Sequence, residues 1–131
     1  MKKIINLIFL LSLGFTASAN ENQSYKLITV STYLNFYLLN LNACEDYHPE
    51  TRLRAYEAES TLYPYFEKLD KKVASLNIDA RDKEAIANTV SVRRTKLNAQ
   101  ITDGEFTVEH CNAVISIVNE GLDEMILQSI K

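Results

Sequence analysis

Apolar residues recur at alternating steps of three and four in several long stretches of the chain. The clearest stretch carries Leu27, Val30, Leu34, Tyr37, Leu41 and Cys44, at steps of 3, 4, 3, 4 and 3. This spacing places all of these side chains on one narrow face of an α-helix. The helix is expected to end at residues 45–47, because a residue that precedes proline, here His48 before Pro49, avoids the α conformation.

A second helix is predicted from Pro49 to about Leu76. Proline suits the first position of a helix, where its missing N–H group costs nothing. The first half of this helix places Leu53, Tyr56 and Tyr63 on its apolar face, and the second half uses Leu62, Phe66, Leu69, Val73 and Leu76. Pro64 stands where the face rotates, and an interior proline removes one backbone hydrogen bond. We therefore expect a kink or short break between Ser60 and Pro64.

A third helix is predicted from Asp79, a good N-cap residue, to about Ile101. Its apolar stripe consists of Ile86, Val90, Leu97 and Ile101, and it is the most polar of the predicted helices. Gly104 follows it and suits the left-handed conformation in which many helices end.

The last helix is predicted to begin after Thr107, another good N-cap residue. Phe106 and Cys111 have the spacing of a hydrophobic staple, in which the two side chains pack across the start of the helix. The apolar face then comprises Val108, Cys111, Ile115, Val118, Leu122 and Met125. Gly121 is expected inside this helix, where it costs about 1 kcal/mol relative to alanine and would mark a close contact between helices.

Four amphipathic helices with short links predict an all-α fold, a small antiparallel four-helix bundle. In this topology the end of the first helix and the start of the last lie at the same pole. Cys44 and Cys111 occupy these two ends, so we expect them to form one disulfide. A bridge between cysteines 67 residues apart would stabilise the fold by roughly 4 kcal/mol in the chain-entropy model.

The first residues have the pattern of a cleaved secretory signal. Basic Met1–Lys3 precedes an apolar run, Ile4–Phe15, and a small-residue cleavage site, Ala17–Ala19. The run of 12 residues is shorter than the roughly 20 that span a bilayer. We therefore expect residues 1–19 to be removed and residues 20–131 to form a single helical domain; a retained anchor or a buried core helix is the alternative.

Charge and cysteine content indicate in which compartment the protein is located and which classes of partner it can bind. Removal of Lys2 and Lys3 reduces the basic residues from 14 to 12 against 17 acidic ones, so the formal charge changes from −3 to −5. An acidic surface disfavours nucleic acid and anionic membranes as partners. An even number of cysteines in an exported chain favours a disulfide, and the short basic start is typical of bacteria. The predicted location is periplasmic or secreted.

The cysteines and histidines raise a metal-binding alternative. His48 is four residues from Cys44, and His110 adjoins Cys111, so the bundle would bring all four together. A Cys2His2 cluster suits zinc or copper, but a disulfide would consume the thiolates that such a site needs. We therefore expect no cofactor, and a metal-binding or redox protein is a minor hypothesis. No catalytic motif for a nucleophile, metalloprotease or phosphate loop is found, so an enzyme is not predicted.

Candidate partner-binding residues come from the tyrosines and from two arginines. Tyr56, Tyr63 and Tyr65 cluster around the predicted break, and tyrosine is enriched at binding surfaces when it is exposed. A place in the core is the alternative. Arg93 falls on the apolar stripe of the third helix and Arg94 flanks it.

Two arrangements are open for Arg93. It could pair with Glu59 across the hairpin of the second and third helices. Alternatively, its aliphatic stem covers the core while its charged head reaches solvent.

The segment Cys44-Glu45-Asp46-Tyr47 resembles the first cysteine region of the small periplasmic acid-stress chaperones, which are also helical with one disulfide. The likeness covers these four residues, and the two cysteines are further apart here than in that family.

The first hypothesis for the function is a non-catalytic protein-binding module, such as an inhibitor or an immunity-type protein. An acid- or stress-activated chaperone is the second, because many carboxylates and two histidines supply groups that titrate in acid.

Overall fold

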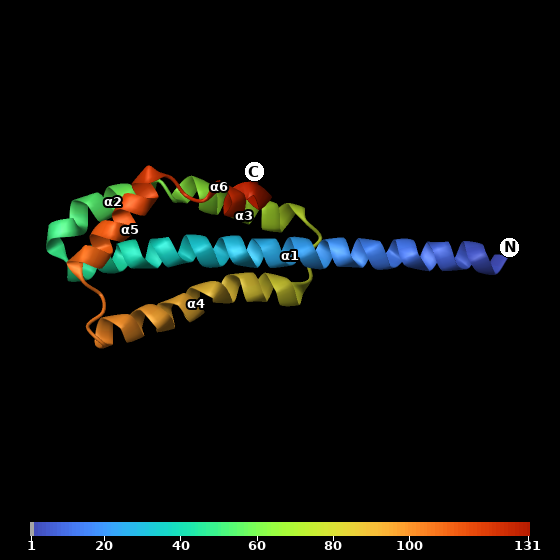
Figure 1. Cartoon of the computed structure of the whole chain (residues 1–131), viewed down its shortest axis with the longest axis horizontal. Coiled ribbons are helices and arrows are strands. Elements are labelled where there is room, and N and C mark those ends of the chain that lie inside the picture. Colours follow the sequence, from blue (N-terminus) through green and yellow to red (C-terminus); the bar gives the residue numbers. More distant parts are fainter. Residues whose placement is uncertain (1) are drawn as a thin grey trace.

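The computed structural model describes the backbone of residues 2–131 and the side chains from Gln23 onward. Its elements are α1 (Lys2–Tyr47), η1 (Pro49–Thr51), α2 (Arg52–Ser60), α3 (Tyr63–Ser75), α4 (Ala80–Thr102), α5 (Val108–Glu120), α6 (Glu124–Leu127) and η2 (Gln128–Ile130) (Figure 1). All regular structure in this part of the chain is helical, which confirms the predicted class. The predicted signal peptide, residues 1–19, lies outside the described side chains and stays a prediction.

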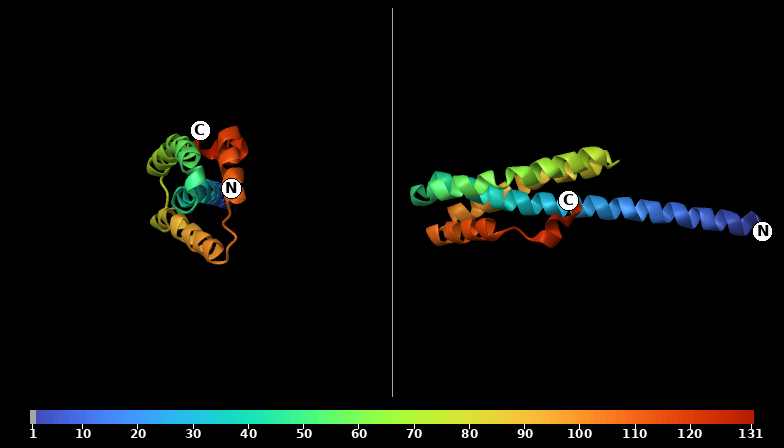
Figure 2. Two further views of the ribbon diagram at one scale, coloured as in Figure 1. Left: turned by 90° about the vertical axis from the view of Figure 1, so that its left-hand side faces the viewer. Right: turned by 90° about the horizontal axis from the view of Figure 1, so that it is seen from above.

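Helix α1 is the centre of the packing. The end-on view in Figure 2 shows it between the α2–α3 pair, α4 and α5, and it contacts each of them. Its predicted apolar face is buried at Leu27, Val30, Leu34, Leu41 and Cys44, with Tyr37 partly buried. A helix that contacts neighbours on several sides needs more than one apolar stripe, and Leu39 and Ala43 are accordingly buried as well.

The chain runs along the bundle in the predicted up-down-up-down order (Figure 1). The expected break of the second helix is confirmed, because α2 ends at Ser60 and α3 begins at Tyr63. Pro64 lies in the first turn of α3, where a missing N–H group costs nothing. Because the helix breaks before Tyr63, Pro64 does not lie in a helix interior.

The predicted ends of the later helices are also confirmed. Asp79 caps α4 by accepting a hydrogen bond from the Arg81 N–H, and Thr107 caps α5 by accepting one from the His110 N–H. Gly104 has a φ of 75°, the left-handed conformation expected after α4. Side-chain chemistry at the chain's turns therefore predicts where its helices start and stop.

The prediction of one continuous last helix is wrong. Gly121 adopts a φ of 120° and ends α5, and the short α6 follows. The expected close helix contact is absent at this glycine, because a Cβ added there would meet no atom within 4 Å. Leu122 is still buried, but Met125 is 84% exposed instead of lying on the core face. Because the chain changes direction at Gly121, the residues after it no longer continue the apolar face of α5.

Helix α4 attaches differently from the other helices. It packs mainly against α1, on the side away from α2 and α5 (Figure 1). Its buried residues are Ile86, Thr89 and Leu97. Thr89 Oγ1 lies 2.8 Å from the Ser31 hydroxyl, and the Asn35 amide donates to the Ser31 carbonyl at 2.9 Å. A buried polar network therefore forms part of the α1–α4 contact.

Candidate binding surface at the disulfide pole

The predicted disulfide is present. Cys44 and Cys111 are fully buried and bonded to each other, with their Cα atoms 5.8 Å apart. Cys44 lies in the last turns of α1 and Cys111 in the first turn of α5, so the bond ties these two helices together. We call this end of the molecule, residues 40–63 and 106–112, the disulfide pole.

Polar contacts hold the turn that follows α1. The His48 Nε2–H group donates to the Phe106 carbonyl oxygen at 2.9 Å, and the two rings stack with centroids 5.5 Å apart. The hydroxyl of the fully buried Thr51 donates to the His48 carbonyl at 2.9 Å. The turn is therefore held by a hydrogen bond within it, from Thr51 to His48, and by the contacts of His48 with Phe106 in the segment before α5.

The second histidine also has a protein partner. Asn40 donates its amide N–H to the Phe36 carbonyl at 2.8 Å, so its Oδ1 is free to accept from His110 Nε2–H, 2.7 Å away. Burial lowers the pKa of His110, because a desolvated imidazolium is disfavoured. The imidazole at this position is accordingly held in its neutral form to lower pH than usual.

The geometry bears on the metal hypothesis for His48 and His110. Both sulfur atoms are used by the disulfide, so the Cys2His2 arrangement is not formed. Across the residues that the structure describes, no group of three or more His, Cys, Asp or Glu side chains could hold a metal ion.

The outer face of the pole carries large apolar side chains in solvent. Tyr47 is 58% exposed, Leu53 70%, Tyr56 63% and Tyr63 49%. The apolar spacing predicted Leu53, Tyr56 and Tyr63 on the apolar face of the second helix, and this assignment is wrong. The residues that α2 turns toward the core are Ala55, Ala58 and Glu59. Alanines allow close approach of helix backbones, so small residues mark the buried face here and large ones the exposed face.

A hollow lies beside these exposed side chains. It has a volume of about 690 Å³ and is lined by Glu45, Asp46, Pro49, Arg52, Leu53 and Tyr56. The lining combines two apolar side chains, Leu53 and Tyr56, with carboxylates from the end of α1. The Arg52 Nε–H group donates to the backbone carbonyl of Glu45 at 3.0 Å. The hollow is therefore formed jointly by the last turn of α1 and the first turns after it.

Two carboxyl groups face each other under this surface. Glu59 is only 9% exposed; the Tyr63 hydroxyl donates to its Oε1, and Asn42, with its amide nitrogen toward Glu59, donates at 3.2 and 2.9 Å. Burial raises the pKa of the neighbouring Glu45 to about 7, together with a hydrogen bond to Glu59 and the charges of Glu59 and Asp46. The Tyr63 pKa rises to about 12, chiefly because its hydroxyl is bonded to Glu59.

The remaining partner-binding candidates do not share this surface. Tyr65 is partly buried against the core, and the Lys68 ammonium lies 5.7 Å from its ring centroid. Arg93 and the exposed Arg94 are on α4, which lies on the other side of α1. The sequence missed Tyr47 and Leu53 as surface residues. The signal for Leu53 was the pair of alanines on the opposite face of α2; no such signal marked Tyr47, which ends α1.

The Glu59–Arg93 pair is not formed. Glu59 is satisfied by Tyr63 and Asn42, as described above. The Arg93 guanidinium instead lies over the Phe36 ring, 5.6 Å from its centroid. The predicted Glu59–Arg93 pair is therefore wrong, and the placement of the Arg93 stem over the core stays a prediction.

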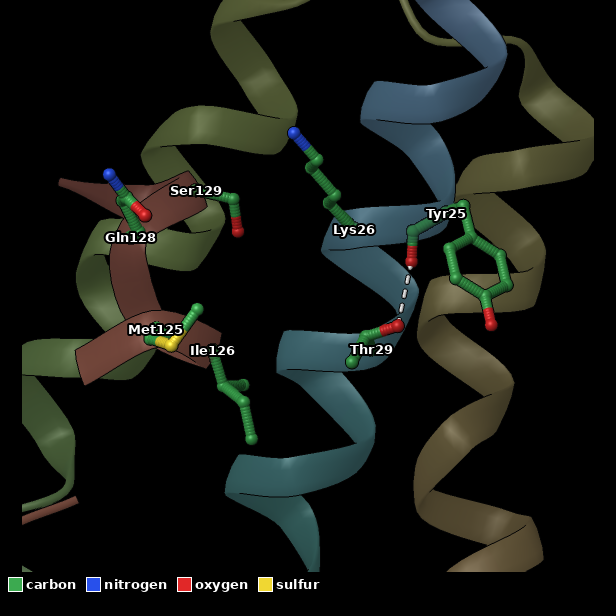
Figure 3. A pocket seen from close by; sticks show the side chains of 7 residues that line it. All are labelled: Tyr25, Lys26, Thr29, Met125, Ile126, Gln128 and Ser129. Carbon is green, nitrogen blue, oxygen red and sulfur yellow. Dashed lines mark hydrogen bonds between the residues drawn. The ribbon is translucent and has the colours of Figure 1, made fainter. Parts of the chain in front are cut away.

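A second hollow lies between α1 and the C-terminal segment. It has a volume of about 570 Å³ and is lined by Tyr25, Lys26, Thr29, Met125, Ile126, Gln128 and Ser129 (Figure 3). Figure 3 shows the Tyr25 ring turned away from α6, while Ile126 extends into the space between the helices. Among the residues that line this hollow, Lys26 is the one that carries a charge at neutral pH. The hollow therefore offers less varied chemistry than the disulfide pole.

Comparison of the chain with protein-family models, with curated proteins and with solved structures found no match. No described helix has both the length and the apolar character that crossing a membrane requires. The function must therefore be argued from the surface itself.

Proposed function

We propose that this chain is a small exported protein, located in the periplasm, that binds another protein without catalysing a reaction, as inhibitors and immunity-type proteins do. The observation that supports this is the exposure of Tyr47, Leu53, Tyr56 and Tyr63 on one end of the molecule. Clustered exposed aromatic side chains are typical of binding surfaces, because they bury a large area at a small cost in conformational entropy.

The position of this cluster strengthens the proposal. The exposed residues of α2 lie on a backbone that the disulfide, the His48–Phe106 hydrogen bond and the buried Thr51 hold in place. A preorganised surface pays less conformational entropy on binding than a mobile one. The disulfide itself fits an oxidising compartment, and the periplasm is the compartment that the proposed signal sequence favours.

Site-specific photocrosslinking in exporting bacterial cells tests the proposal. A photoreactive amino acid replaces Leu53 in one strain and Val92 in another. Val92 is 55% exposed on α4, so it is a matched apolar control. We expect a cross-linked product of discrete mass from position 53 and none from position 92. Equal products from both positions, or from neither, would contradict the proposal.

An acid-activated chaperone is the second candidate, and His110 is the observation that favours it. Its folded-state pKa is lowered by burial, so it contributes stability that is present at neutral pH and lost as the pH falls below its unfolded value. Protonation of His110 in acid would loosen the packing around Phe106. This candidate requires more apolar dye binding at low pH with the disulfide intact, and a smaller gain in His110→Gln. Unchanged dye binding in acid would exclude it.

A further inference from the structure

We infer that the partner segment bound at the disulfide pole is both basic and apolar. A lysine or arginine side chain would reach Glu45 and Glu59, and an adjacent apolar side chain would cover Leu53 and Tyr56. This inference rests on the proposed function and specifies the chemistry of the partner.

The charges around the hollow favour a cationic occupant. Between residues 45 and 59 the chain has five acidic residues, Glu45, Asp46, Glu50, Glu57 and Glu59, and two basic ones, Arg52 and Arg54. Both arginines donate to neutral acceptors: Arg52 to a backbone carbonyl at 3.0 Å and Arg54 to the Asn112 side-chain oxygen at 2.7 Å. The excess negative charge of this surface is therefore left for a partner to neutralise.

The surroundings of Glu59 also favour a cationic partner. The Glu59 carboxyl group is buried, and its hydrogen-bond partners, Tyr63, Asn42 and Glu45, include no cation. Neutral donors satisfy the oxygens without cancelling the charge, and a buried charge is best stabilised by an opposite charge. A cationic side chain entering beside Glu45 would supply it.

The apolar side chains specify the rest of the partner. Leu53 and Tyr56 line the same hollow as Glu45, and Tyr63 bonds to Glu59. A purely charged ligand would leave Leu53 and Tyr56 in water, whereas an apolar neighbour of the basic residue would bury them. A second copy of this chain is disfavoured as the occupant, because a symmetric contact would bring two acidic surfaces together.

Proton release should accompany this binding. Glu45 faces Asp46 on its own helix, Arg52 and Glu59 on α2, and Tyr63 on α3. Burial, together with Glu59 and Asp46, raises the pKa of Glu45 to about 7 against the opposing charge of Arg52. A bound cation favours the ionised carboxylate, so a proton leaves as the cation enters. With one linked proton, the affinity should fall about tenfold between pH 8 and pH 6.

Binding of three synthetic peptides to the oxidised exported protein tests the inference. The first peptide is an amphipathic helix of leucine and lysine; the second has glutamate in place of lysine, and the third has serine in place of leucine. We expect the leucine–lysine peptide to bind about tenfold more tightly than either of the others at pH 8. It should also show the loss of affinity at pH 6.

Four variants locate the binding. Glu45→Gln should weaken the leucine–lysine peptide about tenfold at pH 8 and remove the pH dependence, and Leu53→Ser should weaken it without changing the pH dependence. Glu84→Gln and Val92→Ser, at exposed positions on α4, should change nothing. All four sites lie outside the buried core, so the variants fold.

The outcomes separate the inference from the proposed function. If the glutamate peptide binds as tightly as the lysine peptide, the surface is apolar without charge preference and the inference fails. Equal weakening by the α4 variants would also overturn it. The cross-link from position 53 is measured independently, so protein binding at the pole can stand while the basic–apolar chemistry fails.

Discussion

Helices α5 and α4 both pack on α1, yet they are attached by different physical means. Helix α5 is bonded covalently through Cys44–Cys111 and buries Val114, Ile115 and Val118 beside the bond. Helix α4 has no disulfide to α1 and buries fewer apolar side chains, Ile86 and Leu97, with the polar Ser31–Thr89 contact between them. Exchange of protein hydrogen bonds for water bonds changes the free energy little, whereas burial of apolar surface is favourable.

This contrast indicates which part of the small fold is the most stable. Proteins open locally, and segments with few buried apolar contacts open at lower cost than the core. The disulfide pole combines a covalent bond, fully buried side chains and the proposed binding surface. We therefore expect a firm pole that binds and a more weakly held α4 on the other side of α1.

Removal of the disulfide should have the largest effect. The variant Cys44→Ala/Cys111→Ala should lose roughly 4 kcal/mol of unfolding free energy, because the bridge closes a separation of 67 residues. Urea denaturation followed by circular dichroism measures the loss. Addition of a reducing agent should lower the stability of the wild type but leave the variant unchanged. A loss below about 1 kcal/mol would show that packing alone holds α5, since bridges typically contribute 2–4 kcal/mol.

Glu45→Gln should have the next largest effect, and only at high pH. The folded-state pKa of Glu45 is raised to about 7, so its contribution to stability is present in acid and lost as the pH rises from about 4.5 to about 7. Glutamine resembles the protonated form. At pH 8 the variant should be more stable by about 2 kcal/mol, allowing for solvent screening, and at pH 4 the two proteins should unfold alike. Equal unfolding of the two proteins at pH 8 would show that the pKa of Glu45 is not raised in the folded state.

Thr89→Val tests the polar network under α4. Valine keeps the shape of threonine but leaves the Ser31 hydroxyl without its partner at 2.8 Å. The unfolding free energy should fall by about 1 kcal/mol. Thr95→Val is the matched control on the same helix, because its hydroxyl bonds only to the exposed Ser91 carbonyl. The two variants would be equally stable if the network contributed nothing.

Arg93→Ala should have the smallest effect. It removes the guanidinium that lies over the Phe36 ring, an interaction worth about 0.5–1 kcal/mol at a partly exposed site. Arg94→Ala on the exposed face of the same helix should leave the denaturation midpoint unchanged. A larger loss from Arg94 than from Arg93 would reverse our assignment of the two faces.

The sequence predicted the features that depend on local chemistry. Capping residues at Asp79 and Thr107 mark helix starts, and the position of Pro64 marks the break between α2 and α3. The disulfide also followed from the sequence, because the order of four helices places both cysteines at one pole.

The sequence did not predict the features that depend on which neighbour a helix meets. The α2 face with Leu53 has the more apolar side chains, yet α2 packs through Ala55 and Ala58. Helical periodicity also continues through Gly121, although glycine there takes a φ that ends the helix. Because α2 packs through its alanines, Leu53 and Tyr56 are left exposed at the pole. The candidate site could therefore not be predicted from apolar spacing alone.

Native-state hydrogen exchange of the oxidised protein compares the stability of α4 with that of the disulfide pole in one sample. Amides in α5 and in the last turns of α1 should exchange about a hundredfold more slowly than those in the middle of α4, since they open only with the core. In the cysteine-free variant the difference should shrink. Amides of α4 that exchange as slowly as those of α5, or more slowly, would contradict the weaker attachment of α4.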